Sequence, residues 1–123
     1  PTSRFAARFL GEAAFVRGHR EGALVTTPLG KAPAITHGAT GEALDLMVRP
    51  DDLSVVPSQD GNGVIEWRRY EGETRLYAVR LGDDEPVRVR TNHEVDMAVG
   101  ARVALSIHSE HPLAAFAPES IAS

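Results

Sequence analysis

The chain has 123 residues, no cysteine and a formal net charge of −4, and 42% of its residues are hydrophobic. This length and composition are typical of one globular domain, or of two small β units that share a core. The lack of cysteine excludes disulfides, a thiolate nucleophile and cysteine-based zinc sites, and the acidic balance argues against direct nucleic-acid binding. No stretch approaches the ~20 apolar residues of a membrane span, so we expect no direct membrane insertion.

Residues 1–16 are expected to form a short N-terminal helix or a linker. Thr2 can cap a helix in which Phe5 and Phe9 lie one turn apart, and Gly11 would end that helix. The chain begins with Pro rather than Met, which fits a piece of a longer protein. We therefore interpret this segment as a hinge after an upstream domain.

Beyond Gly18, Gly and Pro recur every several residues between short runs rich in Val, Leu and Ile, a pattern that predicts an all-β sandwich or barrel. Alternation of apolar and polar residues predicts strands at 23–27, 44–48, 64–70, 77–81, 87–90 and 103–107, with a short strand near 34–37. The strand at 64–70 is expected to turn Ile65 and Trp67 towards the core. The small, polar tail at 119–123 is expected to fray.

An internal repeat divides this β region. Segments 46–56 and 105–116 each contain an alternating strand, an acidic turn, a leucine and a short apolar end. They predict two related β units, at about 17–57 and 62–117, with chance similarity of two strand–turn segments as the alternative. The Gly-rich stretch 60–63 is the strongest break in the chain.

Catalytic motifs are missing from the sequence. Gly30 and Lys31 are followed by Ala32, so no phosphate-binding loop is present, and there is no nucleophile elbow. A weak metal site at His108, Glu110 and His111 is an alternative to solvated imidazoles beside a turn, and the acidic pairs at 51–52 and 83–85 fit solvated turns. We therefore expect no enzyme and no cofactor site in this chain.

Arginines and aromatics on three consecutive predicted strands form the best candidate surface. On an OB-like barrel such residues can stack bases and hold phosphates. Trp67 and Tyr77 fit the inward register, however, so the arginines are expected on the opposite face. That face would be solvated or would contact an acidic partner, and its candidate residues are Arg68, Arg69, Arg88 and Arg90.

Four stretches, in this order, resemble the hinge and C-terminal TOBE domain of ABC-importer ATPases. They are Phe9–Phe15, which resembles the hinge; Val48–Leu53, which resembles R-P-E-D-L; Val64–Leu81, with its Y-x-G turn; and Val99–Val103, which resembles V-G-x-x-V. The family often has Asn where this chain has Ala14. The matching motif residues, for which a structural role is expected, are Gly11, Glu12, Arg49, Pro50, Asp51, Leu53, Gly72 and Gly100.

The resemblance implies an OB-like regulatory domain at 17–118, on the cytoplasmic side and after an ATPase domain that holds the ATP and Mg²⁺. It implies homodimer contacts through the parent ATPase, permease subunits as partners, and an iron(III), polyamine or sugar importer, with iron(III) or polyamines favoured. Leu53 is expected in the core, and the carboxylates of Asp51 and Asp52 in solvent. The alternatives are a module that binds a small oxyanion or metabolite, or a nucleic-acid-binding OB domain.

Overall fold

The computed structural model describes residues 7–82, 85–92 and 94–118, and it is all-β. Its elements are β1 (Ala7–Leu10), β2 (Ala13–Glu21), β3 (Leu24–Thr27), β4 (Gly30–Thr36), β5 (Ala43–Val48), the 3₁₀ turn η1 (Pro50–Asp52), β6 (Leu53–Pro57), β7 (Gly63–Glu71), β8 (Thr74–Arg80), β9 (Val87–Asn92), β10 (Arg102–Ile107) and β11 (Leu113–Phe116). Over these ranges, no helix has the length and apolar character to cross a bilayer.

The first sheet closes into a five-stranded barrel. The sheet has six strands in the order β1-β2-β3-β4-β11-β5, and β5 also pairs with β2. The ring therefore consists of β2, β3, β4, β11 and β5, and β1 is attached to it through β2. β11 runs parallel to β4 and antiparallel to β5. A meander of three strands, with the last strand inserted between the third and the fourth, is the Greek-key arrangement of an OB-like barrel. The predicted fold class is confirmed.

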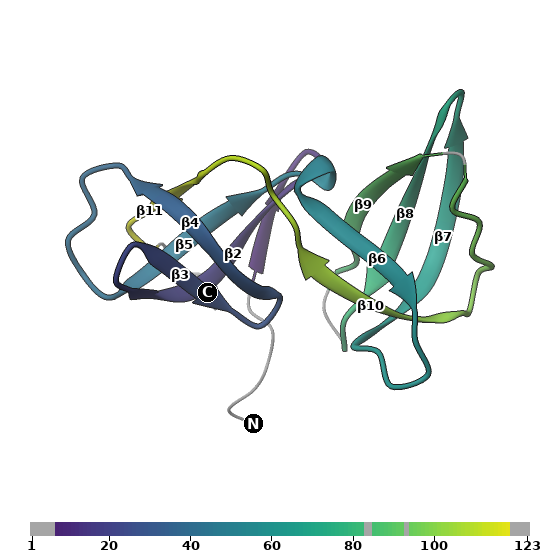
Figure 1. The fold of residues 1–123 in the computed structure, drawn as a ribbon, viewed down its shortest axis with the longest axis horizontal. Helices are drawn as coiled ribbons and strands as arrows, with labels where there is room; N and C mark the ends of the chain where they lie inside the picture. Colours follow the sequence, from purple (N-terminus) through teal and green to yellow (C-terminus); the bar gives the residue numbers. More distant parts are fainter. Residues whose placement is uncertain (1–6, 83–84, 93, 119–123) are drawn as a thin grey trace.

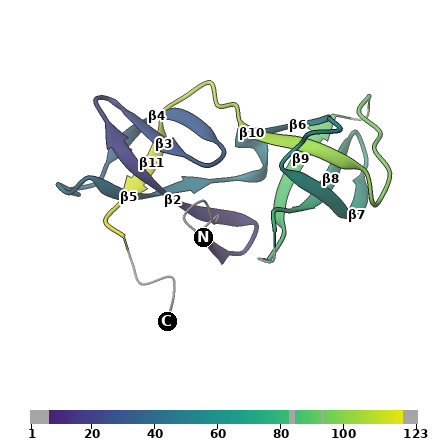
Figure 2. The same cartoon turned by 90° about the horizontal axis from the view of Figure 1, so that it is seen from below.

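The second sheet has five strands in the order β6-β10-β7-β8-β9, and its end strands β6 and β9 contact each other. β7, β8 and β9 form the meander, β10 is the fourth strand, and β6 pairs antiparallel with β10 as β11 does with β5. Figures 1 and 2 show the two barrels side by side, with β6 and β10 together in one and β11 in the other. Both barrels therefore combine a three-stranded meander with a fourth strand and a fifth strand that runs antiparallel to the fourth.

Each sequence unit gives its fifth strand to the other barrel. β6 belongs to the predicted unit 17–57 but pairs in the second sheet, and β11 belongs to 62–117 but pairs in the first. The predicted units are therefore not two separate barrels. The repeated segments 46–56 and 105–116 contain the two crossovers between sheets, residues 49–52 and 108–112, which together we call the junction.

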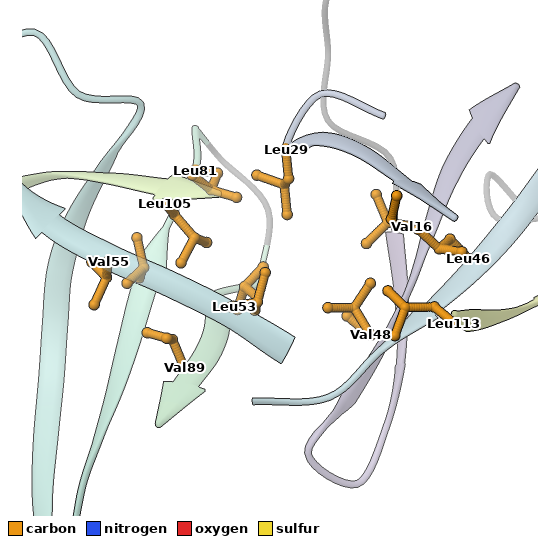
Figure 3. Close-up of a cluster of buried hydrophobic side chains, with 14 of the residues drawn as sticks. Val16, Leu29, Leu46, Val48, Leu53, Val55, Leu81, Val89, Leu105 and Leu113 are labelled. Atoms are coloured by element: carbon orange, nitrogen blue, oxygen red, sulfur yellow. The ribbon is translucent and has the colours of Figure 1, made fainter. Parts of the chain in front are cut away.

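One hydrophobic cluster runs through both barrels and across the junction. Figure 3 shows Leu53 and Leu29 between the side chains of the two barrels. Leu53 is only 6% exposed, as predicted. Leu29 comes from a loop of the first barrel, and its carbonyl accepts a hydrogen bond from the Ile107 amide of β10 (2.9 Å). The two barrels are therefore packed as one body.

The N-terminal helix prediction is wrong over the described residues, and residues 1–6 lie outside them. Ala7–Leu10 is a strand, which pairs antiparallel with the start of β2. Gly11 lies in the turn between the two strands with φ +61°, a conformation that glycine adopts easily. A short apolar run fits a helix or a strand equally well, and here pairing with β2 decides the outcome. Rotation at Gly11 would break this ladder, and the boundary drawn after residue 16 lies inside β2.

The inward orientation predicted for Trp67 is also wrong. Ile65 pairs with Val79, but Trp67 pairs with Ala78, because the ladder shifts by one residue between Ile65 and Trp67. Such a bulge turns the residues that follow it to the opposite face of the sheet. Ile65 is buried and Trp67 is half-buried on the outer face.

Asn62 uses its side chain to extend the ladder of β10. Its Nδ2 donates to the Leu105 carbonyl (3.0 Å), and its Oδ1 accepts from the Leu105 amide (2.8 Å). Asn62→Asp should cost about 2 kcal/mol in the free energy of unfolding, because a carboxylate oxygen would replace the donor facing a carbonyl. Urea unfolding checks this. Asn92→Asp is the matched control, since the Asn92 side chain accepts from the Glu94 amide and a carboxylate keeps that bond.

Candidate functional site

The segment Arg49–Leu53 forms the first crossover of the junction. The Arg49 amide donates to the Asp52 carboxylate (2.9 Å), and the Asp52 amide donates to the Arg49 carbonyl (2.9 Å). Pro50 and Asp52 are buried, whereas Asp51 is exposed. The solvated position predicted for the carboxylates therefore holds for Asp51 and is wrong for Asp52, because the buried carboxylate is needed to close this tight turn.

The second crossover lies against the first. The His108 amide donates to the Asp52 carbonyl (2.8 Å), and His111 Nε2 lies 3.6 Å from Asp52 Oδ1. Among the described residues, no group of three His, Cys, Asp or Glu side chains is arranged to hold a metal ion. His108 and His111 instead contact the first crossover at Asp52.

Arg90 of β9 is the centre of an ion-pair network. It contacts Glu12 (3.1 Å) in the β1–β2 turn, Glu71 (3.1 Å) at the end of β7, and Asp51 (3.5 Å) in η1. Arg69 contacts Glu71 (3.0 Å) and Glu12 (3.6 Å). Three motif segments that are distant in sequence therefore meet at one arginine, which ties the hairpin of the first barrel to the second barrel.

The charged forms of Glu71 and Arg90 stabilise each other. Hydrogen bonds from Arg90, and then from Arg69, hold the pKa of Glu71 below its ordinary value. Partial burial lowers the pKa of Arg90, but its hydrogen bonds to Glu12 and Glu71 outweigh that effect, so the net pKa is raised. Glu71 and Arg90 are therefore both charged at neutral pH.

The Glu71 pairing makes stability depend on pH in the acidic range. Because the folded-state pKa is the lower one, the stabilisation is complete above the ordinary pKa of about 4.3 and is lost as pH falls through the folded value. Glu71→Gln should lower the melting temperature at pH 7 and have little effect near pH 3. Thermal unfolding of Glu73→Gln, in the same turn but exposed, is the control; an equal loss at both pH values for Glu71→Gln would contradict the pairing.

The predicted arginine surface divides into two. The guanidinium groups of Arg69 and Arg88 lie 5.8 and 5.4 Å from the centroid of the Trp67 ring, and with Arg90 these residues form what we call the arginine face. It covers Leu76 and Ala78, which are fully buried although they lie outside the main core. Arg68 lies on the other face of the sheet and pairs with Asp96 (3.0 Å).

The remaining motif residues occupy turns. Gly72 has φ +73° in the turn between β7 and β8, and Gly100 has φ +92° just before β10. The Gly100 amide donates to the Ile65 carbonyl (2.8 Å), which positions β10 against the start of β7. These two glycines therefore have a structural role in the turns of the second barrel.

The fold and the junction define a class of protein: a double OB-like β-barrel module whose two sequence units exchange their last strands. Residues 46–114 match the TOBE domain family, and the chain belongs to this family. The matched range begins in β5 and ends in β11, so it contains both crossovers and the whole second sheet.

A similar protein is the spermidine/putrescine import ATP-binding protein PotA of Pseudomonas fluorescens. It is 32% identical over 120 residues, which cover 87% of this chain and 33% of the relative. The chain thus spans about a third of the length of the relative that it matches.

Proposed function

We propose that this chain is the accessory domain of the ATP-binding subunit of an ABC importer and does no catalysis by itself. Membership of the TOBE family carries this proposal, and the similarity to an import ATP-binding protein supports it. In such an assembly, an ATPase domain would precede the chain and bind ATP and Mg²⁺. The parent subunit would then contact permease subunits at the cytoplasmic face of the membrane.

Polyamines are the substrate class that we favour for the importer. The relative that matches this chain is named for spermidine and putrescine, whereas nothing in the described structure favours iron(III). The substrate preference is a property of the whole importer, so this choice rests on the likeness and not on a site in the chain.

The rigid junction suggests how the domain would work. Because the core is continuous and Glu12 pairs with Arg90, the β1–β2 hairpin would move with both barrels. Gly11 would therefore not act as the hinge towards an ATPase domain. Two such domains in contact would keep two ATPase copies at high effective concentration while the hinges flex, which is the homodimer role.

A chimera tests the proposal. The TOBE domain of a polyamine-importer ATPase is replaced by this chain, and putrescine uptake is measured in a strain that lacks its own importer. Restored uptake, together with co-purification of the permease subunits, would support the role. A chimera that hydrolyses ATP yet neither binds the permease nor restores uptake would contradict it.

A further inference from the structure

A pocket of about 290 Å³ opens beside the junction. It lies between the turn of the β1–β2 hairpin, the end of β5, η1 and β9. One side is apolar and is formed mainly by Leu10, Phe15, Met47 and Pro50. The charged residues of its lining are Glu12, Arg49, Asp51 and Arg90. This volume is close to the lower end of the range for small-molecule sites.

The two arginines of the pocket differ in what they already contact. Arg90 is held by Glu12, Glu71 and Asp51, so its charge is balanced within the protein. Arg49 is exposed, and across the described ranges it makes no ion pair with a carboxylate. The two carboxylates of the lining, those of Glu12 and Asp51, both contact Arg90. Arg49 is therefore the charged residue of the lining that is left to pair with a ligand, and it lies beside an apolar wall.

We propose that this pocket binds a small organic carboxylate. The guanidinium of Arg49 is a planar fork that pairs with a carboxylate through two parallel hydrogen bonds. The apolar body of the ligand would lie against Phe15 and Met47, where burial of apolar area favours binding. An inorganic oxyanion would leave that wall unused.

Binding at this place would have a mechanical consequence. The ligand would contact the hairpin and β5 of the first barrel, the crossover η1, and β9 of the second barrel. It would therefore stabilise the junction as a whole, as expected of an effector site. This inference goes beyond the proposed accessory role and does not depend on the importer assignment.

Titration of the 123-residue chain with 4-methylpentanoate, followed by two-dimensional NMR, tests the proposal. We expect saturable binding in the millimolar range or tighter, with shifts at the amides of Ala13, Phe15, Met47, Arg49 and Asp51. Arg49→Gln should weaken binding by at least about tenfold, the equivalent of a lost charged hydrogen bond. Arg102→Gln, which removes an exposed arginine of β10 away from the pocket, should leave binding unchanged.

A second variant separates ligand binding from folding. Met47→Glu places a negative charge in the apolar wall and should abolish binding while the β-sheet circular dichroism persists. Saturation by sulfate as tight as by 4-methylpentanoate would overturn the proposal, because the wall would then add nothing. Absence of binding, or binding that Arg49→Gln leaves unchanged, would overturn it as well.

Discussion

Replacement of Leu53 by aspartate should abolish the cooperative folding of the whole chain. The side chain is 6% exposed and packs in the cluster that joins the two barrels. Loss of its apolar burial costs about 2 kcal/mol, and an unpaired carboxylate in this position costs several more. The sum, about 5 kcal/mol or more, approaches the full stability of a domain of this size.

Val56→Asp is the matched control for that experiment. Val56 lies on the same strand, β6, but is 52% exposed, so the same substitution should cost less than about 1 kcal/mol. Urea unfolding followed by circular dichroism measures both variants. If Leu53→Asp unfolds with the midpoint of Val56→Asp, the packing around Leu53 is not the part of the core that couples the barrels.

Strands with a clear period of two could be predicted from sequence, because each has one buried face. Val103 and Leu105 in β10 are buried as their alternation indicates, and so are Val87 and Val89 in β9. The exchange of β6 and β11 could not be predicted in this way. Alternation shows which face of a strand is buried, but it carries no information on which sheet the strand joins.

Trp67 shows a second limit of the sequence pattern. One extra residue, at the bulge near Glu66, reverses the face of every residue after it. This single shift places Trp67 with Arg69 and Arg88 and moves Arg68 to the opposite side. No local feature of the strand signals the shift, so the predicted four-arginine surface could not have been resolved from sequence.

The Arg90 network was predictable only in parts. Glu12, Asp51 and Arg90 each belong to a segment that the sequence singles out, but Glu12 and Arg90 are separated by 78 positions. Only the exchanged-strand topology brings the hairpin, η1 and β9 together. Glu71 was not predicted to take part in an ion pair. The signal available in the sequence was its place just before Gly72 and two residues after Arg69.

Gly61→Ala should be the most damaging conservative substitution in the chain. A Cβ at this position would lie 1.9 Å from the carbonyl oxygen of Val103 and 2.2 Å from its carbon. These are backbone atoms of β10, and Val103 pairs with Pro57 on one side and Gly63 on the other. The strand therefore cannot move without breaking two ladders, and we expect a loss of about 3 kcal/mol or more.

Gly41→Ala is the control for Gly61→Ala, because a Cβ at Gly41 meets no atom within 4 Å. Reduced freedom of the unfolded chain should make that variant neutral or slightly more stable, by up to about 1 kcal/mol. Each variant differs from the parent by one methyl group. Thermal and urea unfolding of both variants therefore compare the free-energy cost of the same chemical change in two surroundings. Equal stability of both variants would mean that the loop at 60–63 can lift away from β10, and the second barrel would then tolerate more motion than its packing indicates.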